Sequence, residues 1–185
     1  VPRYEDHDDS QNLYGNWIRG VADRIPNLVF AALISADEAE AAQYKARCIE
    51  YLEAVVVKYP YWAELGGEDS GGGVYGEGHL AAAQAAFDSA VAASWLYDDL
   101  TPELKMSVHQ RMYKACAVMD YLWRNHANIL GNHMWNAFGG MTAASMLMYA
   151  HSEDAFAAIS ALDMDKVKYD LGLTINREKS VEELE

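Results

Sequence analysis

An alanine-dense segment at residues 79–100, HLAAAQAAFDSAVAASWLYDDL, constrains the fold more than any other part of the sequence. Alanine favours the α-helix, and its small side chain lets neighbouring helices approach closely. The segment therefore predicts a helix against which other helices pack tightly.

Apolar residues recur at helical spacing through most of the remaining chain. Further helices are predicted at residues 17–34 with a break near Pro26, at 37–59, at 102–123, at 135–149, and over a shorter stretch that begins at Ser152. Alternating, β-branched runs separated by hairpin signals, which would predict strands, do not occur. The sequence therefore predicts an all-α fold made of successive antiparallel helix pairs.

Local signals mark several of the predicted helix ends. Acidic residues crowd the start of the helix at 37–59, where the helix dipole favours negative charge. Thr101 is a candidate N-cap, and Pro102 is a candidate first helical residue. The preceding Tyr-Asp-Asp-Leu sequence at 97–100 is typical of a turn that ends a helix.

Length and charge limit the classes of function. A chain of 185 residues suffices for one domain with a core. We assign residues 1–16 to a polar lead-in, 17–165 to the helical domain and 166–185 to a polar tail or the start of a further helix. The net charge of −14 argues against nucleic acid as a partner. No apolar run approaches the roughly 20 residues that a membrane helix needs, so no membrane partner is expected.

Cysteine and histidine give no sign of a metal or cofactor. Cys48 and Cys116 lie inside predicted helices, and we interpret them as buried free thiols rather than a disulfide. The histidines are His7, His79, His109, His126, His133 and His151. They form no HExxH motif or other tight ligand set, so neither a metal nor a cofactor is expected. A GxSxG nucleophile motif is also missing.

The glycine-rich sequence GGEDSGGGVYGEG lies at residues 66–78. It lacks the Lys-Ser/Thr ending of a phosphate-binding loop, and no predicted strand precedes it. We interpret it as a connection between helices. The functional alternative is a lip over a cleft, with Tyr75 and His79 as the contacting groups.

Two Asn-His pairs, Asn125-His126 and Asn132-His133, lie between two predicted helices. The first pair follows a helix end, where both residue types are common caps, and Asn132 is placed to cap the next helix. That next helix is rich in small residues, which suit tight packing in a helical core. His133 would therefore project from a rigid base toward the helix mouth. We interpret the second pair as the stronger functional candidate, with helix capping as its alternative.

Three ordered segments resemble uronate-polysaccharide lyases of the heparinase II/III-like and alginate-lyase families, which have an α/α toroid. The segments are RIPNLVFAALISADEAEAAQYKARCIEYLEAVVVKYPYW at 24–62, HLAAAQAAFDSAVAASWLYDDLTPELKMSVHQRM at 79–112 and GNHMWNAFGGMTAASMLM at 131–148. The resemblance implies that the antiparallel helix pairs form an incomplete α/α toroid.

The resemblance also implies a reaction, β-elimination at a uronic acid of an anionic polysaccharide such as alginate or a glycosaminoglycan. In such lyases an Asn and a His neutralise the uronate carboxylate, which stabilises the enolate-like transition state. A His or a Tyr then removes the C5 proton. Carried over by motif, Asn132 would neutralise the carboxylate, and His133 would neutralise it or act as the base. The predicted substrate-binding residues are Arg24, Tyr75, His79, His126, Trp135 and Asn136.

The chain departs from the family pattern in two ways. The family's catalytic Tyr follows the Asn-His motif by several tens of residues, and no matching segment is recognisable here, since Tyr169 stands in another context. The predicted helices also make about half a toroid. We therefore expect the N-terminal part of a toroid in a secreted or periplasmic protein, with the remaining toroid and β-sandwich domains as partners.

Two alternative functions remain open at the level of sequence. One is a catalytically silent helical toroid that binds carbohydrate or protein. The other is a toroidal glycoside hydrolase, which needs two carboxylates across a cleft, with Glu77 and either Asp88 or Asp98 as candidates.

Overall fold

The structure, a computed structural model, describes residues 13–58, 78–125, 132–165 and 167. Within these ranges the side chains of residues 13–17, 78–79, 121–125 and 132–134 lie outside the description. The secondary structure of the described residues is helical, with no strand among them, which confirms the all-α prediction.

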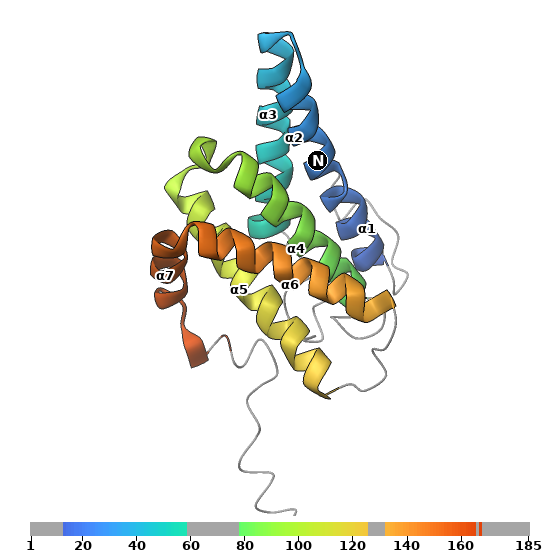
Figure 1. Ribbon diagram of the computed structural model, residues 1–185, viewed down its shortest axis with the longest axis vertical. Coiled ribbons are helices and arrows are strands. Elements are labelled where there is room, and N and C mark those ends of the chain that lie inside the picture. Colours follow the sequence, from blue (N-terminus) through green and yellow to red (C-terminus); the bar gives the residue numbers. More distant parts are fainter. Residues whose placement is uncertain (1–12, 59–77, 126–131, 166, 168–185) are drawn as a thin grey trace, which may run out of the picture.

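The elements follow one another with short connections wherever the structure describes the connection (Figure 1). In chain order they are α1 (Leu13–Ala22), α2 (Arg24–Ile34), α3 (Glu38–Glu53), the π-helical turn η2 (Ala54–Lys58), α4 (Gly78–Trp95), the 3-10 turn η4 (Tyr97–Asp99), α5 (Pro102–Asn125), α6 (Asn132–Ala150) and α7 (Ser152–Ser160).

The break predicted near Pro26 is present but lies three residues earlier, at Asp23, which separates α1 from α2. Pro26 has no N–H to offer the carbonyl of Ala22, four residues earlier. The helical hydrogen-bond pattern is therefore interrupted before the proline, and Pro26 lies in the first turn of α2, where its missing N–H costs nothing. α1 begins at Leu13, four residues before the predicted start.

Side-chain caps explain where α3 and α5 begin. The Asp37 carboxylate accepts hydrogen bonds from the backbone N–H groups of Ala39 at 2.8 Å and Glu40 at 3.1 Å. The Thr101 hydroxyl accepts one from the Leu104 N–H at 3.2 Å, and α5 begins at Pro102, as predicted.

Further predicted helix boundaries differ from the structure. The alanine-rich helix α4 ends at Trp95, not at residue 100, because the Tyr-Asp-Asp sequence forms the turn η4. The turn itself was predicted. α6 begins at Asn132 rather than at residue 135, so Asn132 is its first helical residue. α5 ends at Asn125, two residues beyond the predicted end, and α7 begins at Ser152, as predicted.

α4 lies at the centre of the described structure and packs against α1, α2, α5 and α6. α1, α2, α4 and α6 run in the same general direction, and α3 and α5 run back (Figure 1). Most of the α4 side chains are buried, and nearly all of them are alanines: Ala81, Ala82, Ala83, Ala85, Ala86, Ala90, Ala92 and Ala93. The small side chains of α4 therefore let neighbours approach it from several sides.

At Gly140, α6 approaches α4 so closely that there is no room for a side chain. A Cβ atom built on Gly140 of α6 would lie 2.6 Å from the carbonyl oxygen of Ala83 and 2.9 Å from its Cα. The same atom built on the neighbouring Gly139 would meet nothing within 4 Å. Gly140 is therefore required by packing, whereas Gly139 is not.

The two cysteines are free thiols, as predicted. The Cys48 Sγ donates to the carbonyl oxygen of Ile25 at 3.5 Å and ties α3 to α2. The Cys116 Sγ lies 3.9 Å from the carbonyl oxygen of Met141 and joins α5 to α6. Within the described part of the chain, no helix is long and apolar enough to span a membrane.

The contrast between the two glycines gives a direct test of this packing. Gly140→Ala should lower the free energy of unfolding by about 1–3 kcal/mol or more, because the added methyl group meets backbone atoms that cannot move aside. Gly139→Ala should raise it by about 0.5–1 kcal/mol, because alanine loses less conformational freedom in a helix. Urea unfolding followed by circular dichroism measures both, and equal effects would show that the helices are not packed this tightly.

Candidate functional site

The predicted catalytic residues stand at one end of the α4–α6 pair. α4 and α6 begin at the same end of the structure (Figure 1), and Gly140 packs against Ala83 between them. Asn132 and His133 are the first two residues of α6, and His79 is the second residue of α4. The side chains of all three lie outside the described residues, as do Tyr75 and His126 altogether.

Trp135 and Asn136 follow in the first turns of α6, and both are exposed. The Trp135 side chain is 70% exposed, an unusual state for an indole. The fold therefore brings Trp135 and Asn136 to the same end as residues 79, 132 and 133.

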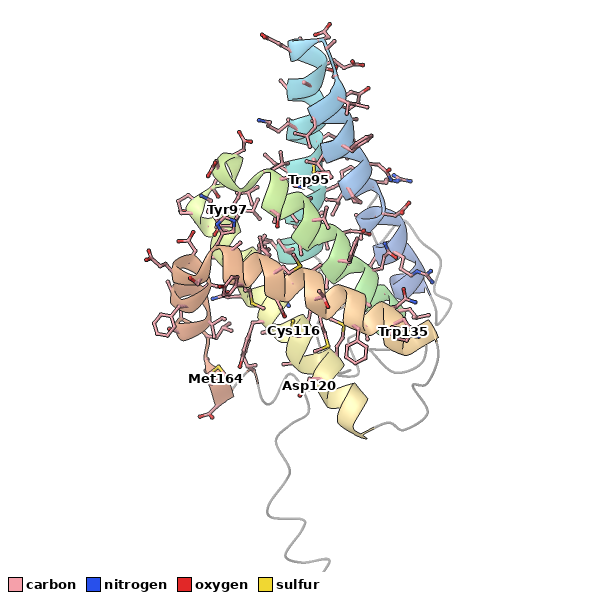
Figure 2. All side chains as sticks on the ribbon, in the orientation of Figure 1. Trp95, Tyr97, Cys116, Asp120, Trp135 and Met164 are labelled. Atoms are coloured by element: carbon pink, nitrogen blue, oxygen red, sulfur yellow. The ribbon has the colours of Figure 1, made fainter. Side chains whose placement is uncertain are left out.

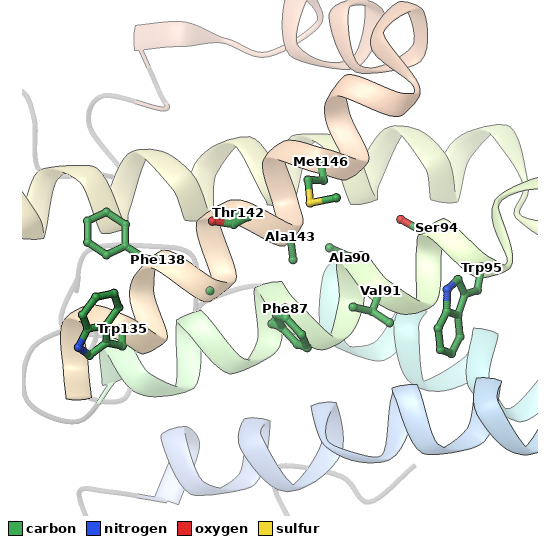
Figure 3. Close-up of a pocket in the computed structure, with 11 residues that line it drawn as sticks. Phe87, Ala90, Val91, Ser94, Trp95, Trp135, Phe138, Thr142, Ala143 and Met146 are labelled. Carbon is green, nitrogen blue, oxygen red and sulfur yellow. The ribbon is translucent and has the colours of Figure 1, made fainter. Parts of the chain in front are cut away.

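An apolar groove with a volume of about 580 Å³ runs between α4 and α6 (Figure 3). Its walls carry large exposed side chains from both helices: Phe87 and Trp95 from α4, and Trp135, Phe138 and Met146 from α6. Ser94 and Thr142 supply hydroxyl groups. The groove is thus a mostly hydrophobic surface with aromatic rings along its length.

Sequence reasoning identified Trp135 but missed the other aromatic residues of this groove. A signal was present, because Phe87, Val91 and Trp95 follow each other at intervals of four along α4, on one helix face. The sequence alone does not show whether this face is buried or exposed. In the described structure no helix covers it.

Arg24 lies apart from this groove. It lines a hollow of about 300 Å³ on the α2–α3 pair, together with Asn27, Leu28, Arg47 and Tyr51. α6 packs against α4, α5 and α7 rather than against α2 or α3. The structure therefore does not bring Arg24 together with the residues of α6.

The carboxylates considered for a glycoside hydrolase do not face one another across the groove. Asp88 is only 3% exposed and is not part of the groove wall. Burial raises its pKa to about 6, against a hydrogen bond from the Gln84 amide at 2.7 Å. Asp98 is exposed in η4, and Glu77 lies outside the described residues. The arrangement of the described candidates gives the hydrolase no support.

A partly buried polar cluster that the sequence did not predict joins η4, α5 and α7 around Tyr97 (Figure 2). The Tyr97 hydroxyl donates to the Asp154 carboxylate at 2.7 Å and lies 2.8 Å from the Nε2 of His109. The His151 ring stacks on the Tyr97 ring with centroids 3.4 Å apart, and the Lys105 ammonium lies 4.5 Å from the centroid of the same ring. No residue of this cluster lines the groove.

The hydrogen bonds of the cluster define the protonation of His109. Because the Tyr97 hydroxyl donates to Asp154, it accepts from His109, so Nε2 carries the proton in the neutral ring. The Nδ1 of His109 is buried without a hydrogen-bond partner. Burial lowers the pKa of His109, against the charge of Asp154, which raises it. His109 therefore belongs to a structural cluster that favours a neutral imidazole.

The same cluster places the proton firmly on Tyr97. Burial, followed by the hydrogen bond to Asp154 and the charge of that carboxylate, raises the pKa of Tyr97 above its ordinary value. A tyrosinate base needs the opposite shift. The surroundings of Tyr97 therefore do not favour a tyrosinate.

No group of three or more histidine, cysteine, aspartate or glutamate side chains in the described part of the chain is arranged to hold a metal ion.

Acid should weaken the fold through His109. Its pKa is lowered in the folded state, so its contribution to stability is complete above the unfolded pKa near 6.5 and is lost as the pH falls below that value. The wild-type free energy of unfolding should therefore fall between pH 7 and pH 5 more steeply than that of His109→Gln. For one proton the difference in slope is at most about 1.4 kcal/mol per pH unit. Parallel curves from urea unfolding would contradict this role.

Comparison with known proteins gives no relative: no protein-family model, no curated protein and no solved structure matches this chain.

Proposed function

We propose that this chain is part of an α/α-toroid polysaccharide lyase that cleaves a uronate-containing anionic polysaccharide by β-elimination. The direction of the helices supports the toroid. α1, α2, α4 and α6 run one way and α3 and α5 return (Figure 1), and an α/α toroid is built from such alternating helix pairs.

The observation that carries the proposal is the shared end of α4 and α6. Two helix N-termini meet there, and unpaired backbone N–H groups and the helix dipole make such ends favourable for an anion. Neither α4 nor α6 has an acidic residue in its first turn, whereas α3, α5 and α7 all do. In a chain with a net charge of −14, this end is thus suited to a uronate carboxylate.

Helical spacing favours Asn132 as the residue nearest the substrate. Asn132 precedes Trp135 by three residues and Gly139 by seven, and both of these line the groove. Such spacing places positions on one helix face. Position 133 precedes Gly140 by seven residues and so belongs to the face of α6 that packs on α4, the helix of His79.

The proposed chemistry follows from these positions. Asn132 donates to the uronate carboxylate and makes the neighbouring C5 proton more acidic by stabilising the enolate-like transition state. His133 completes the neutralisation or removes the proton. The exposed Trp135 indole offers a flat surface for a sugar ring, and the aromatic groove beyond it provides room for further sugar units.

The reaction can be followed directly, because the unsaturated uronate product absorbs near 235 nm. The full-length protein that contains this chain should produce this absorbance with alginate, heparan sulfate or dermatan sulfate. Asn132→Ala and His133→Ala should each lower the rate at least about 100-fold, the usual effect of losing such a donor. Asn125→Ala is the matched control and should leave it within about twofold. No absorbance with any of the three polymers would overturn the proposal.

The groove favours a second candidate, a helical domain that binds carbohydrate without cleaving it. The exposed aromatic rings on α4 and α6 can bind a sugar chain without any catalytic group.

In that case uronate oligosaccharides should bind without any change in absorbance at 235 nm. Trp95→Ala and Trp135→Ala should each weaken binding by about 3- to 10-fold, as expected for the loss of one stacking partner. Phe156→Ala, on the exposed surface of α7, is the control and should leave the affinity unchanged. Calorimetric titration measures these affinities, and equal effects of all three changes would exclude the groove as the binding surface.

A further inference from the structure

The α2–α3 pair holds two arginines beside the same hollow. The Cys48 Sγ donates to the carbonyl oxygen of Ile25, so residues 25 and 48 lie opposite each other. Arg24 and Arg47 are the preceding residues of the two helices, and both line the hollow of about 300 Å³. The register of the helix pair thus brings two guanidinium groups to one hollow of a strongly acidic chain.

Tyr51 orients both arginines. The Arg24 Nη1 donates to the Tyr51 hydroxyl at 3.2 Å. The guanidinium carbon of Arg47 lies 5.2 Å from the centroid of the Tyr51 ring, within the range of a cation–π contact. The Tyr51 ring is buried, so it gives the two flexible side chains a fixed support.

The N–H donors of Arg24 and Arg47 outnumber the acceptors that the protein offers them around the hollow. Each guanidinium has five N–H donors. Arg24 forms no ion pair with a described carboxylate, and Arg47 pairs with Glu50 on its own helix. That pair is exposed on both sides, so it stabilises the protein by at most about 1 kcal/mol and exchanges readily. Asn27, whose amide donates to the carbonyl oxygen of Asp23 at 2.7 Å, completes the polar rim.

We propose that this hollow binds a tetrahedral oxyanion, a sulfate or phosphate group, between Arg24 and Arg47. A carboxylate carries one negative charge on two oxygens and matches the charge of one guanidinium group. Sulfate and doubly ionised phosphate carry two negative charges on more oxygens, so they suit two guanidinium groups from different helices better. Leu28 supplies an apolar wall beside the charged rim, so the group can be free or carried on a small organic unit. This site is independent of the lyase activity proposed above.

The nearby acidic groups keep the affinity low. Glu50 competes for Arg47, and Asp23 lies next to Arg24 in the chain and close enough to Asp88 for its charge to raise the pKa of that residue. The hollow is also open to solvent, where salt screens charge interactions. Binding in the millimolar range, weakened by added salt, is therefore expected.

The test is a titration of the ¹⁵N-labelled chain with sodium sulfate and, separately, sodium phosphate at constant ionic strength. The Nε–H signals of Arg24 and Arg47 should shift in a saturable way, while that of the exposed Arg19 on α1 should not. Arg24→Gln and Arg47→Gln should each weaken binding at least about tenfold. Arg19→Gln is the matched control and should bind as the wild type does. Because Tyr51 acts as a positioning residue, Tyr51→Phe should weaken binding by a smaller factor.

Two further arms define the ligand. Acetate should bind at least about tenfold more weakly than sulfate, and equal binding would overturn the assignment to a tetrahedral group. Glucose 6-sulfate binding more tightly than inorganic sulfate would indicate an ester-linked group, and the reverse order would indicate a free ion. Shifts that do not saturate, or that are the same in Arg19→Gln, Arg24→Gln and Arg47→Gln, would overturn the site itself. Spectra of each variant without ligand verify its fold.

Discussion

The close contact between α4 and α6 is the constraint on which the rest of the described structure depends. It requires glycine at position 140 and small residues along α4, because backbone atoms rather than side chains meet there. This contact leaves the long side chains of both helices to project outward, where they form the walls of the aromatic groove. It also aligns the first turns of the two helices, which is the geometric basis of the proposed lyase site.

A different kind of interaction holds α7. The buried Tyr97 and His109 form a polar cluster with the exposed Asp154, and the Gln110 amide donates to the carbonyl oxygen of Ala158 at 3.0 Å. Such hydrogen bonds are strong only when every buried group has a partner, and the Nδ1 of His109 has none in the described structure. The α4–α6 contact at Gly140 is made by backbone atoms, whereas the attachment of α7 involves a histidine whose burial favours the neutral form.

The parts of this fold that local chemistry determines could be predicted from the sequence, and those that depend on tertiary contacts could not. Thr101 and Pro102 mark the start of α5 because capping and the missing proline N–H act within one helical turn. The break was predicted near Pro26 but lies at Asp23, because the N–H group that proline lacks would have bonded to a carbonyl one helical turn earlier. The Tyr97 cluster was missed because its members are up to 57 residues apart, and no local pattern joins Tyr97 to Asp154.

The same division applies to the candidate site. The small-residue character of α6 and the position of Asn132 at its start were visible in the sequence. The groove could not be predicted from the sequence. Aromatic residues at helical spacing, such as Phe87 and Trp95, occur on buried and on exposed helix faces, and only the neighbouring helices decide between the two. Arg24 was assigned to the cleft by charge alone, and only the register of α2 against α3 places it with Arg47 instead.

The two free thiols have a consequence for how the fold can be observed in motion. Cys48 is fully buried between α2 and α3, and burial raises its pKa to about 12; burial also raises the pKa of Cys116, which lies between α5 and α6. Only the thiolate reacts with alkylating reagents, so each cysteine becomes reactive when its own helix pair separates. The alkylation rate at Cys48 thus measures the local opening of the α2–α3 pair, and the rate at Cys116 separately measures that of the α5–α6 pair.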